Sequence, residues 1–274
     1  MLFIDFVKEF YRVPRETLWN FFLKFGIPPK FIRLIIALHR IIVQLSINGA
    51  EAEIESIIGV KKGDVLGPII FIIYMVALTN TWKHKEDTSP CLFRSKQSSI
   101  ITGRCHNIVR GVEEFAMTES PYADNAAFLF PSREIAERNT PRIIKHCAEW
   151  GMEVHSGITK TPNAKGKTSK TELLFVEKPS HTELTNLSPI FLEEGSFIPV
   201  VNKLCYLGSI INHNIRESED VDNHIKKASQ AFGALRRGVF TSKSTSFNIK
   251  KAVYTALILS VLLHGAEEWS LTET

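Results

Sequence analysis

The longest apolar run of the sequence, Val65 to Leu78, constrains the fold more than any other segment. Its 14 residues fall short of the roughly 20 that a membrane-spanning helix needs. Because the run is too apolar for an exposed segment, it predicts a buried helix against which other elements pack. With 274 residues, 44% of them hydrophobic, the chain is expected to form one or two globular domains without a signal peptide or membrane span.

Short extended patterns alternate with longer helical patterns along the chain, which predicts an α+β fold. Leu2–Asp5 predicts a buried strand, and Asn48-Gly49 between two extended runs predicts a β-hairpin. Helices are expected after Pro14, after Pro28-Pro29 and over Ser132–Trp150.

Two helical segments have a predicted apolar face. In the helix that follows Pro28-Pro29, the residues expected to face the core are Phe31, Leu34, Ile35 and Leu38. Near the C-terminus, apolar residues recur at spacings of four and three: Val221, Ile225, Ala228, Phe232, Leu235 and Val239.

The charge pattern divides the chain near residue 212. Between Asp222 and Glu267 there is no acidic residue, whereas seven cations occur there: Lys226, Lys227, Arg236, Arg237, Lys243, Lys250 and Lys251. This pattern suits a phosphate backbone, although a solvated helix face would show it as well. We therefore expect an α+β body over residues 1–211, with a polar insertion at about 83–116, and a basic helical segment over 212–274.

The four cysteines lie far apart, and none forms a C-x-x-C pair. This spacing excludes a zinc knuckle and a disulfide scaffold, so no disulfide partner is expected and the protein is expected in a reducing, intracellular compartment. The pattern does not distinguish nucleus from cytoplasm. The nine histidines show no metal-ligand spacing.

Three motifs contain polar residues that a packing role does not require. Asp5 ends an apolar strand within the segment Phe3–Phe10, Gly59–Gly63 leads through Gly67-Pro68 into the apolar helix, and Tyr122-Ala123-Asp124-Asn125 lies between two hydrophobic runs. Each has an ordinary structural explanation, namely a strand cap, a loop before a helix and a hairpin turn.

Taken in order, these motifs resemble those of non-LTR (LINE-type) reverse transcriptases. Three later segments extend the resemblance, so that it spans residues 3–269: Lys170-Thr171-Glu172, Tyr206-Leu207-Gly208-Ser209 and Leu262–Trp269. The resemblance implies the palm of a right-hand polymerase, an antiparallel sheet with packed helices, followed by a helical thumb. Motifs of the fingers precede Asp5 in that family, so a copy that is truncated at its N-terminus, with its fingers mostly absent, and partly degenerate is expected.

The resemblance also implies a reaction, RNA-directed DNA polymerisation with two Mg²⁺ ions, or Mn²⁺ in their place. The partners it implies are an RNA template–DNA primer duplex and a deoxynucleoside triphosphate (dNTP). By resemblance Asp5 and Asp124 are the metal ligands, while Asn125 stands where the family has a second aspartate. Lys170 would neutralise or protonate the leaving pyrophosphate, with Lys160 as the second choice.

The remaining implied roles concern substrate binding. Phe10 would be a steric gate whose ring occupies the space that a ribose 2′-hydroxyl needs, with Lys62, Gly63 and Tyr122 beside the incoming nucleotide. The duplex would contact the basic segment and the primer-grip hairpin, through Lys226, Lys227, Arg236, Arg237, Tyr206 and Gly208.

Several residues depart from the family pattern. Asn125 removes one negative charge, and Pro121 is expected to loosen the hairpin because proline cannot donate to a central β-ladder. An alternative interpretation is therefore a catalytically inactive remnant with at most non-specific nucleic-acid binding. A phosphohydrolase with Asp5 as nucleophile is a weaker alternative, because no second aspartate follows two residues later.

Overall fold

The computed structural model describes residues 1–85, 90–96, 112–122, 125–158, 169–176, 188–192 and 195–269. The chain divides into two compact units, the first formed by residues 1–173 and 188–199 and the second by residues 174–187 and 200–274. Most of the expected polar insertion lies outside the described residues, as do Asp124 and Lys160.

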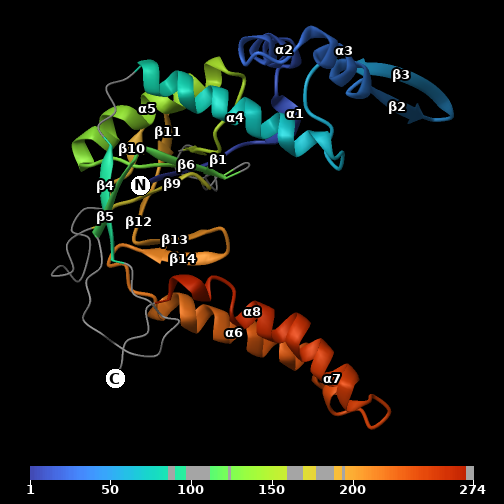
Figure 1. Ribbon diagram of the computed structural model, residues 1–274, viewed down its shortest axis with the longest axis vertical. Helices are drawn as coiled ribbons and strands as arrows, with labels where there is room; N and C mark the ends of the chain where they lie inside the picture. Colours follow the sequence, from blue (N-terminus) through green and yellow to red (C-terminus); the bar gives the residue numbers. More distant parts are fainter. Residues whose placement is uncertain are drawn as a thin grey trace. The chain divides into compact units, whose positions relative to one another are not determined.

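The central sheet of the first unit contains the predicted strand Leu2–Asp5. Four antiparallel strands lie side by side (Figure 1) in the order β9 (Glu172–Leu174), β1 (Leu2–Asp5), β7 (Asn125–Phe128) and β6 (Glu119–Tyr122). Leu2 pairs with Phe128 on one side and with Leu173 on the other. β1 thus has a neighbour on each side, and its apolar residues Leu2, Phe3 and Ile4 are buried.

Pro121 does not have the effect expected from the sequence. It lies in β6, at the edge of the sheet, and pairs across from Ala126 of β7. An edge strand tolerates proline because one side of the strand needs no ladder donor. The strand pair that brackets Asp124 is therefore formed despite this residue.

The apolar run forms α4 (Leu66–Lys85), which lies with α5 (Arg133–Glu149) on one side of the sheet (Figure 1). One face of α4 is buried, as predicted, through Phe71, Tyr74 and Leu78. On the opposite face, Ile69 and Ile72 are exposed. The prediction of a buried helix therefore holds for one face of α4 only.

Tyr74 joins α4 to the end of α5. Its hydroxyl donates a hydrogen bond to the backbone oxygen of Trp150, and burial raises the pKa of Tyr74. We expect Tyr74→Phe to lower the free energy of unfolding by about 1–2 kcal/mol, because the Trp150 oxygen then loses its partner. Urea denaturation measures this loss. The matched variant Tyr11→Phe removes an exposed hydroxyl and should stay within about 0.5 kcal/mol; equal effects of the two variants would refute the expectation.

Three helices follow β1. They are α1 (Glu9–Arg12), α2 (Arg15–Lys24) and α3 (Pro29–Leu38), and α2 and α3 begin after Pro14 and Pro28 as predicted. The predicted inward face of α3 is wrong. Phe31 is 58% exposed and Leu34 and Leu38 are exposed too, whereas Ile32 is buried, because α3 packs on α2 through a narrow contact.

The predicted hairpin at Asn48-Gly49 is confirmed. Its strands, β2 (Ile41–Ile47) and β3 (Ala50–Ser56), pair in register from Ile41 with Ser56 to Ile47 with Ala50. Asn48 and Gly49 have φ values of 52° and 84°. Positive φ at both turn residues is the requirement of a type I′ turn, which Asn-Gly satisfies best.

Smaller β-structures complete the first unit. They are the hairpin of β4 (Cys91–Lys96) with β5 (Val112–Met117), and a sheet in the order β10 (Ile190–Phe191), β11 (Ser196–Ile198), β8 (Gly157–Ile158). Cys91, Cys147 and Cys205 are free thiols, and burial raises the pKa of Cys147 to about 12. In the described part of the chain, no helix has the length and apolarity needed to cross a membrane.

The second unit begins with β-structure and ends with two helical arms. The elements are β12 (Val200–Val201), β13 (Lys203–Tyr206), β14 (Ser209–Asn212), α6 (Ser218–Leu235), α7 (Phe247–Val253) and α8 (Ser260–Leu262). π-Helical turns extend α6 to Phe240 and join α7 to α8. The first arm is α6 with its extension, and the second arm is formed by α7, α8 and the π-helical turns between them. The second arm packs along α6 (Figure 1). Strands β13 and β14 form a hairpin that contacts α6.

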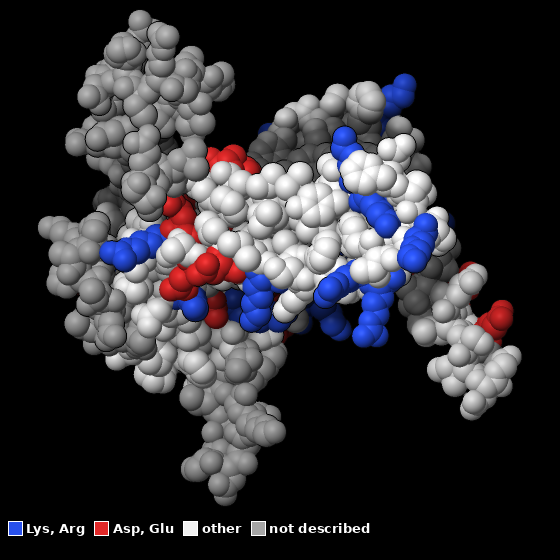
Figure 2. Space-filling view, turned by 90° about the horizontal axis from the view of Figure 1, so that it is seen from below, with Lys and Arg blue, Asp and Glu red and all other residues white. Residues whose placement is uncertain are grey.

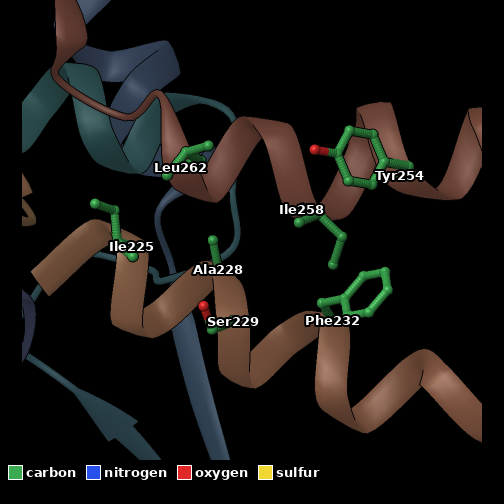
Figure 3. Close-up of a pocket in the computed structure, with 7 residues that line it drawn as sticks. All are labelled: Ile225, Ala228, Ser229, Phe232, Tyr254, Ile258 and Leu262. Atoms are coloured by element: carbon green, nitrogen blue, oxygen red, sulfur yellow. The ribbon is translucent and has the colours of Figure 1, made fainter. Parts of the chain in front are cut away.

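The predicted apolar face of α6 is only partly buried. Ile225 and Phe232 are exposed and line an open groove opposite Tyr254 and Ile258 of the second arm (Figure 3). The buried residues of α6 are Asp220, His224 and Ala228. Two of these are polar, and their contacts, described below, explain why they replace the predicted apolar ones.

Candidate active site

Side chains at the ends of three neighbouring strands form a row across the sheet of the first unit. Asp5 of β1 pairs directly with Asn125 of β7, and Asn125 pairs with Tyr122 of β6. Residues directly opposite each other in antiparallel strands project from the same face. Asp5, Asn125 and Tyr122 therefore share one face of the sheet, at the end of the hairpin that contains Asp124.

The backbone of Asp5 is fixed, while its carboxylate remains accessible. The amide of Asp5 donates to Thr171 Oγ1 (3.1 Å), and the amide of His155 donates to the backbone oxygen of Asp5 (2.8 Å). The Asp5 side chain is 36% exposed. This arrangement holds an anionic group at a defined place that solvent and ligands can reach.

Lys170 lies next to Asp5. Its Nζ is 3.8 Å from Asp5 Oδ2, and its side chain is 66% exposed. Its backbone amide donates to His155 Nδ1 (3.2 Å), which fixes the base of the side chain. A solvated ion pair of this length contributes little to stability, so the ammonium group can turn to another anion.

Phe10 and Lys62 form a second cluster, against α4. The rings of Phe10 and Phe71 stack with their centroids 4.5 Å apart, and Lys62 Nζ lies 5.9 Å from the Phe10 centroid. Phe71 is fully buried and Phe10 half-buried. Next to Lys62, Gly63 is exposed at φ +89°, and apart from its chain neighbours no described group lies within 4 Å of the place a Cβ would take. Phe10 thus presents an aromatic surface that cannot retreat into the core.

Of the two predicted metal ligands, the structure describes Asp5. Asp124 lies outside the described residues, and among those that are described no group of three His, Cys, Asp or Glu side chains could hold a metal ion. Asp5 and the Asn125 amide oxygen are hard oxygen donors of the kind that Mg²⁺ accepts. One further acid, Glu172 of β9, pairs with Phe3, which lies two residues before Asp5 in β1. Burial raises the pKa of Glu172.

The side chain of His264 contacts the turn of the β13–β14 hairpin. Gly208 has φ +97°, and a Cβ there would lie 2.6 Å from His264 Nε2. His264 Nε2 lies 3.0 Å from the backbone oxygen of Leu207, to which it can donate. Tyr206, the other predicted primer contact, is the last residue of β13 and is half-buried.

A buried carboxylate also holds this hairpin. Asp220 of α6 accepts hydrogen bonds from the amide of Ile210 (2.7 Å) and from Trp269 Nε1 (3.0 Å). Buried His224 places Nε2 3.4 Å from Asp220 Oδ1 and Nδ1 3.0 Å from the backbone oxygen of Val261. The sequence gives no signal for this polar cluster, because its partners lie far apart along the chain.

The four predicted duplex-binding cations are exposed. Lys226 and Lys227 lie on α6, and Arg236 and Arg237 on its π-helical extension. Figure 2 shows Lys and Arg side chains along the border of a broad uncharged area. Clustered cations without interspersed acids produce a positive potential that attracts polyanions.

A comparison with protein families agrees with the resemblance to reverse transcriptases. Residues 1–171 match the family described as Reverse transcriptase (RNA-dependent DNA polymerase). Because the match covers more than half of the 274 residues, the chain belongs to the reverse transcriptase family. The α+β architecture of the first unit is compatible with this assignment. No curated protein matches the sequence.

Proposed function

We propose that this chain is a LINE-type reverse transcriptase that adds deoxynucleotides to a primer 3′-hydroxyl, directed by an RNA template. The observation that carries the proposal is the row of Asp5, Asn125 and Tyr122 across three strands, with Lys170 3.8 Å from Asp5. This row combines an accessible carboxylate, a neutral oxygen donor and a cation at one edge of a rigid sheet. Two-metal nucleotidyl transfer uses oxygen ligands for the ions and positive charge near the phosphates.

Asp5 and Asp124 would hold two Mg²⁺ ions, with the Asn125 amide oxygen as a neutral ligand or a contact to the primer. When bound, the ions make the primer hydroxyl a better nucleophile and neutralise charge on the phosphates. The fixed backbone of Asp5 keeps its carboxylate in one place, so little reorganisation is needed during the reaction.

Lys170 would act on the leaving pyrophosphate. Its ammonium group is exposed and only loosely paired with Asp5, so a triphosphate can recruit it without breaking a strong contact. A cation at this place can neutralise the negative charge that develops on the leaving group or donate a proton to it.

Phe10 would select the sugar of the incoming nucleotide. Its ring is backed by Phe71 at 4.5 Å, so it would exclude a ribose 2′-hydroxyl rather than move aside. Lys62, Gly63 and Tyr122 would line the same nucleotide site, Lys62 with a positive charge above the Phe10 ring.

The second unit would bind the template–primer duplex without reading its sequence. Lys226, Lys227, Arg236 and Arg237 supply exposed cations for phosphates, and Tyr206 and Gly208 form the hairpin that would contact the primer. Such binding weakens steeply with salt, because each phosphate contact releases a counterion.

Primer extension tests the proposal. We expect the purified chain to extend a DNA primer on an RNA template with Mg²⁺ or Mn²⁺ and not in the presence of a chelator, with an unprimed template as control. Lack of extension, together with salt-sensitive duplex binding, would refute the enzyme and favour the alternative of an inactive nucleic-acid-binding remnant.

A further inference from the structure

Arg15 is a buried arginine whose guanidinium group contacts backbone carbonyls. It is 9% exposed. Its Nε donates to the oxygen of Gly59 (2.6 Å), and its two terminal nitrogens donate to the oxygens of Ser56 (2.8 Å) and Ile58 (3.2 Å). One side chain thus binds three carbonyls within four residues. Burial lowers the pKa of Arg15, an effect that the charge of Glu55 opposes.

The segment that Arg15 binds leads into the loop that carries Lys62, and it is also attached to Phe10. The amide of Gly59 donates to the oxygen of Val13 (2.8 Å), and the amide of Val60 donates to the oxygen of Phe10 (2.6 Å). Gly59 has φ +84°, and a Cβ there would lie 2.9 Å from the Tyr11 backbone. The chain around Gly59 therefore lies directly against the segment that ends in Arg15.

His39 holds the other end of the same loop. It is 1% exposed, and its Nε2 accepts a hydrogen bond from the amide of Lys61 (3.4 Å). The proton is then on Nδ1, which lies 3.8 Å from Asp64 Oδ2. Arg15 thus holds the chain before Lys61 and His39 holds it at Lys61, and the exposed Lys62 follows directly.

We infer that Arg15 is a positioning residue that sets the distance between Lys62 and the Phe10 ring, and thereby the preference for deoxyribonucleotides. The inference rests on the proposed polymerase function. Two connections support it: Arg15 binds Gly59, and the next residue, Val60, binds the Phe10 backbone. A shift of the Gly59–Val60 segment would move both the ring and the ammonium group above it.

The planar guanidinium group is essential to this role. Its donors form a rigid fork, whereas a lysine ammonium is a single point charge that cannot bind three separate carbonyls in one plane. Arg15→Lys therefore keeps the charge and removes the geometry. The same change at the exposed Arg33 of α3 provides a matched control.

The test is primer extension with each triphosphate, comparing kcat/KM for a dNTP with kcat/KM for the matching ribonucleotide. We expect Arg15→Lys to lower this ratio about tenfold, mainly through easier ribonucleotide incorporation, and Arg33→Lys to leave it unchanged. A merely structural role would lower both rates together and leave the ratio unchanged, which would overturn the inference while the polymerase function stands. A wild-type chain that extends no primer would instead overturn the proposed function, and with it this role.

A thermal unfolding curve shows whether the Arg15→Lys protein folds. If it does not fold, a second variant, Lys62→Met, tests the inference. Lys62 is exposed, so Lys62→Met should fold. It removes the charge that lies 5.9 Å from the Phe10 ring. We expect a lower dNTP preference for this variant too, and an unchanged ratio would show that the position of the loop does not determine sugar selection.

Discussion

Asp5→Asn is expected to reduce primer extension about 10³-fold or more. A metal ligand contributes several kcal/mol of charge stabilisation in the transition state, and each 1.36 kcal/mol corresponds to a tenfold change in rate. The amide keeps the shape of the carboxylate and loses its charge. The measurement is the single-turnover rate of nucleotide addition at saturating Mg²⁺.

The structure separates this effect from a loss of folding. The bonds that anchor Asp5 come from its backbone, and the ion pair with Lys170 is solvated, so stability should change by less than about 1 kcal/mol. Glu16→Gln, the same type of change at an exposed site of α2, should leave the rate unchanged. An Asp5→Asn protein that keeps a tenth of the wild-type rate would exclude Asp5 as a metal ligand.

Asp220→Ala is expected to lower the free energy of unfolding of the second unit by about 3 kcal/mol or more. The change leaves the half-buried donors Ile210 N and Trp269 Nε1 without their acceptor, and it removes the carboxylate that faces buried His224. A hydrogen bond to a charged group typically contributes about 1.5–3 kcal/mol, and Asp220 accepts two of them. Amide hydrogen exchange of residues 203–212 in the full chain would report the loss.

The neighbouring Asp222 provides the control for Asp220. It is exposed on the same helix, two residues further along, and Asp222→Ala should change stability by less than about 0.5 kcal/mol. Similar protection of the β13–β14 hairpin in the two variants would contradict the role assigned to Asp220.

The sequence could predict elements that local chemistry specifies. The strand Leu2–Asp5 follows from its apolar run, and the hairpin follows from Asn48-Gly49, because that pair suits a turn with two positive φ values. Of the candidate site, the structure shows that two motif residues, Asp5 and Asn125, are neighbours across the sheet; their roles stay a prediction.

Long-range polar contacts could not be predicted. Arg15, His39 and Asp220 carry charged or polar side chains, for which exposure is the usual expectation, yet all three are buried because they bind backbone groups of distant segments. The same limit explains α6, whose buried face includes Asp220 and His224 instead of Ile225 and Phe232.

Pro121 also bears on the addition of further strands to the sheet. An edge strand presents unpaired backbone groups to which a strand of another molecule can add. In β6 the proline removes one backbone donor from the edge of the sheet that carries Asp5. The residue that departs from the family pattern beside the candidate site therefore leaves one backbone donor fewer at this edge for the strand of another molecule.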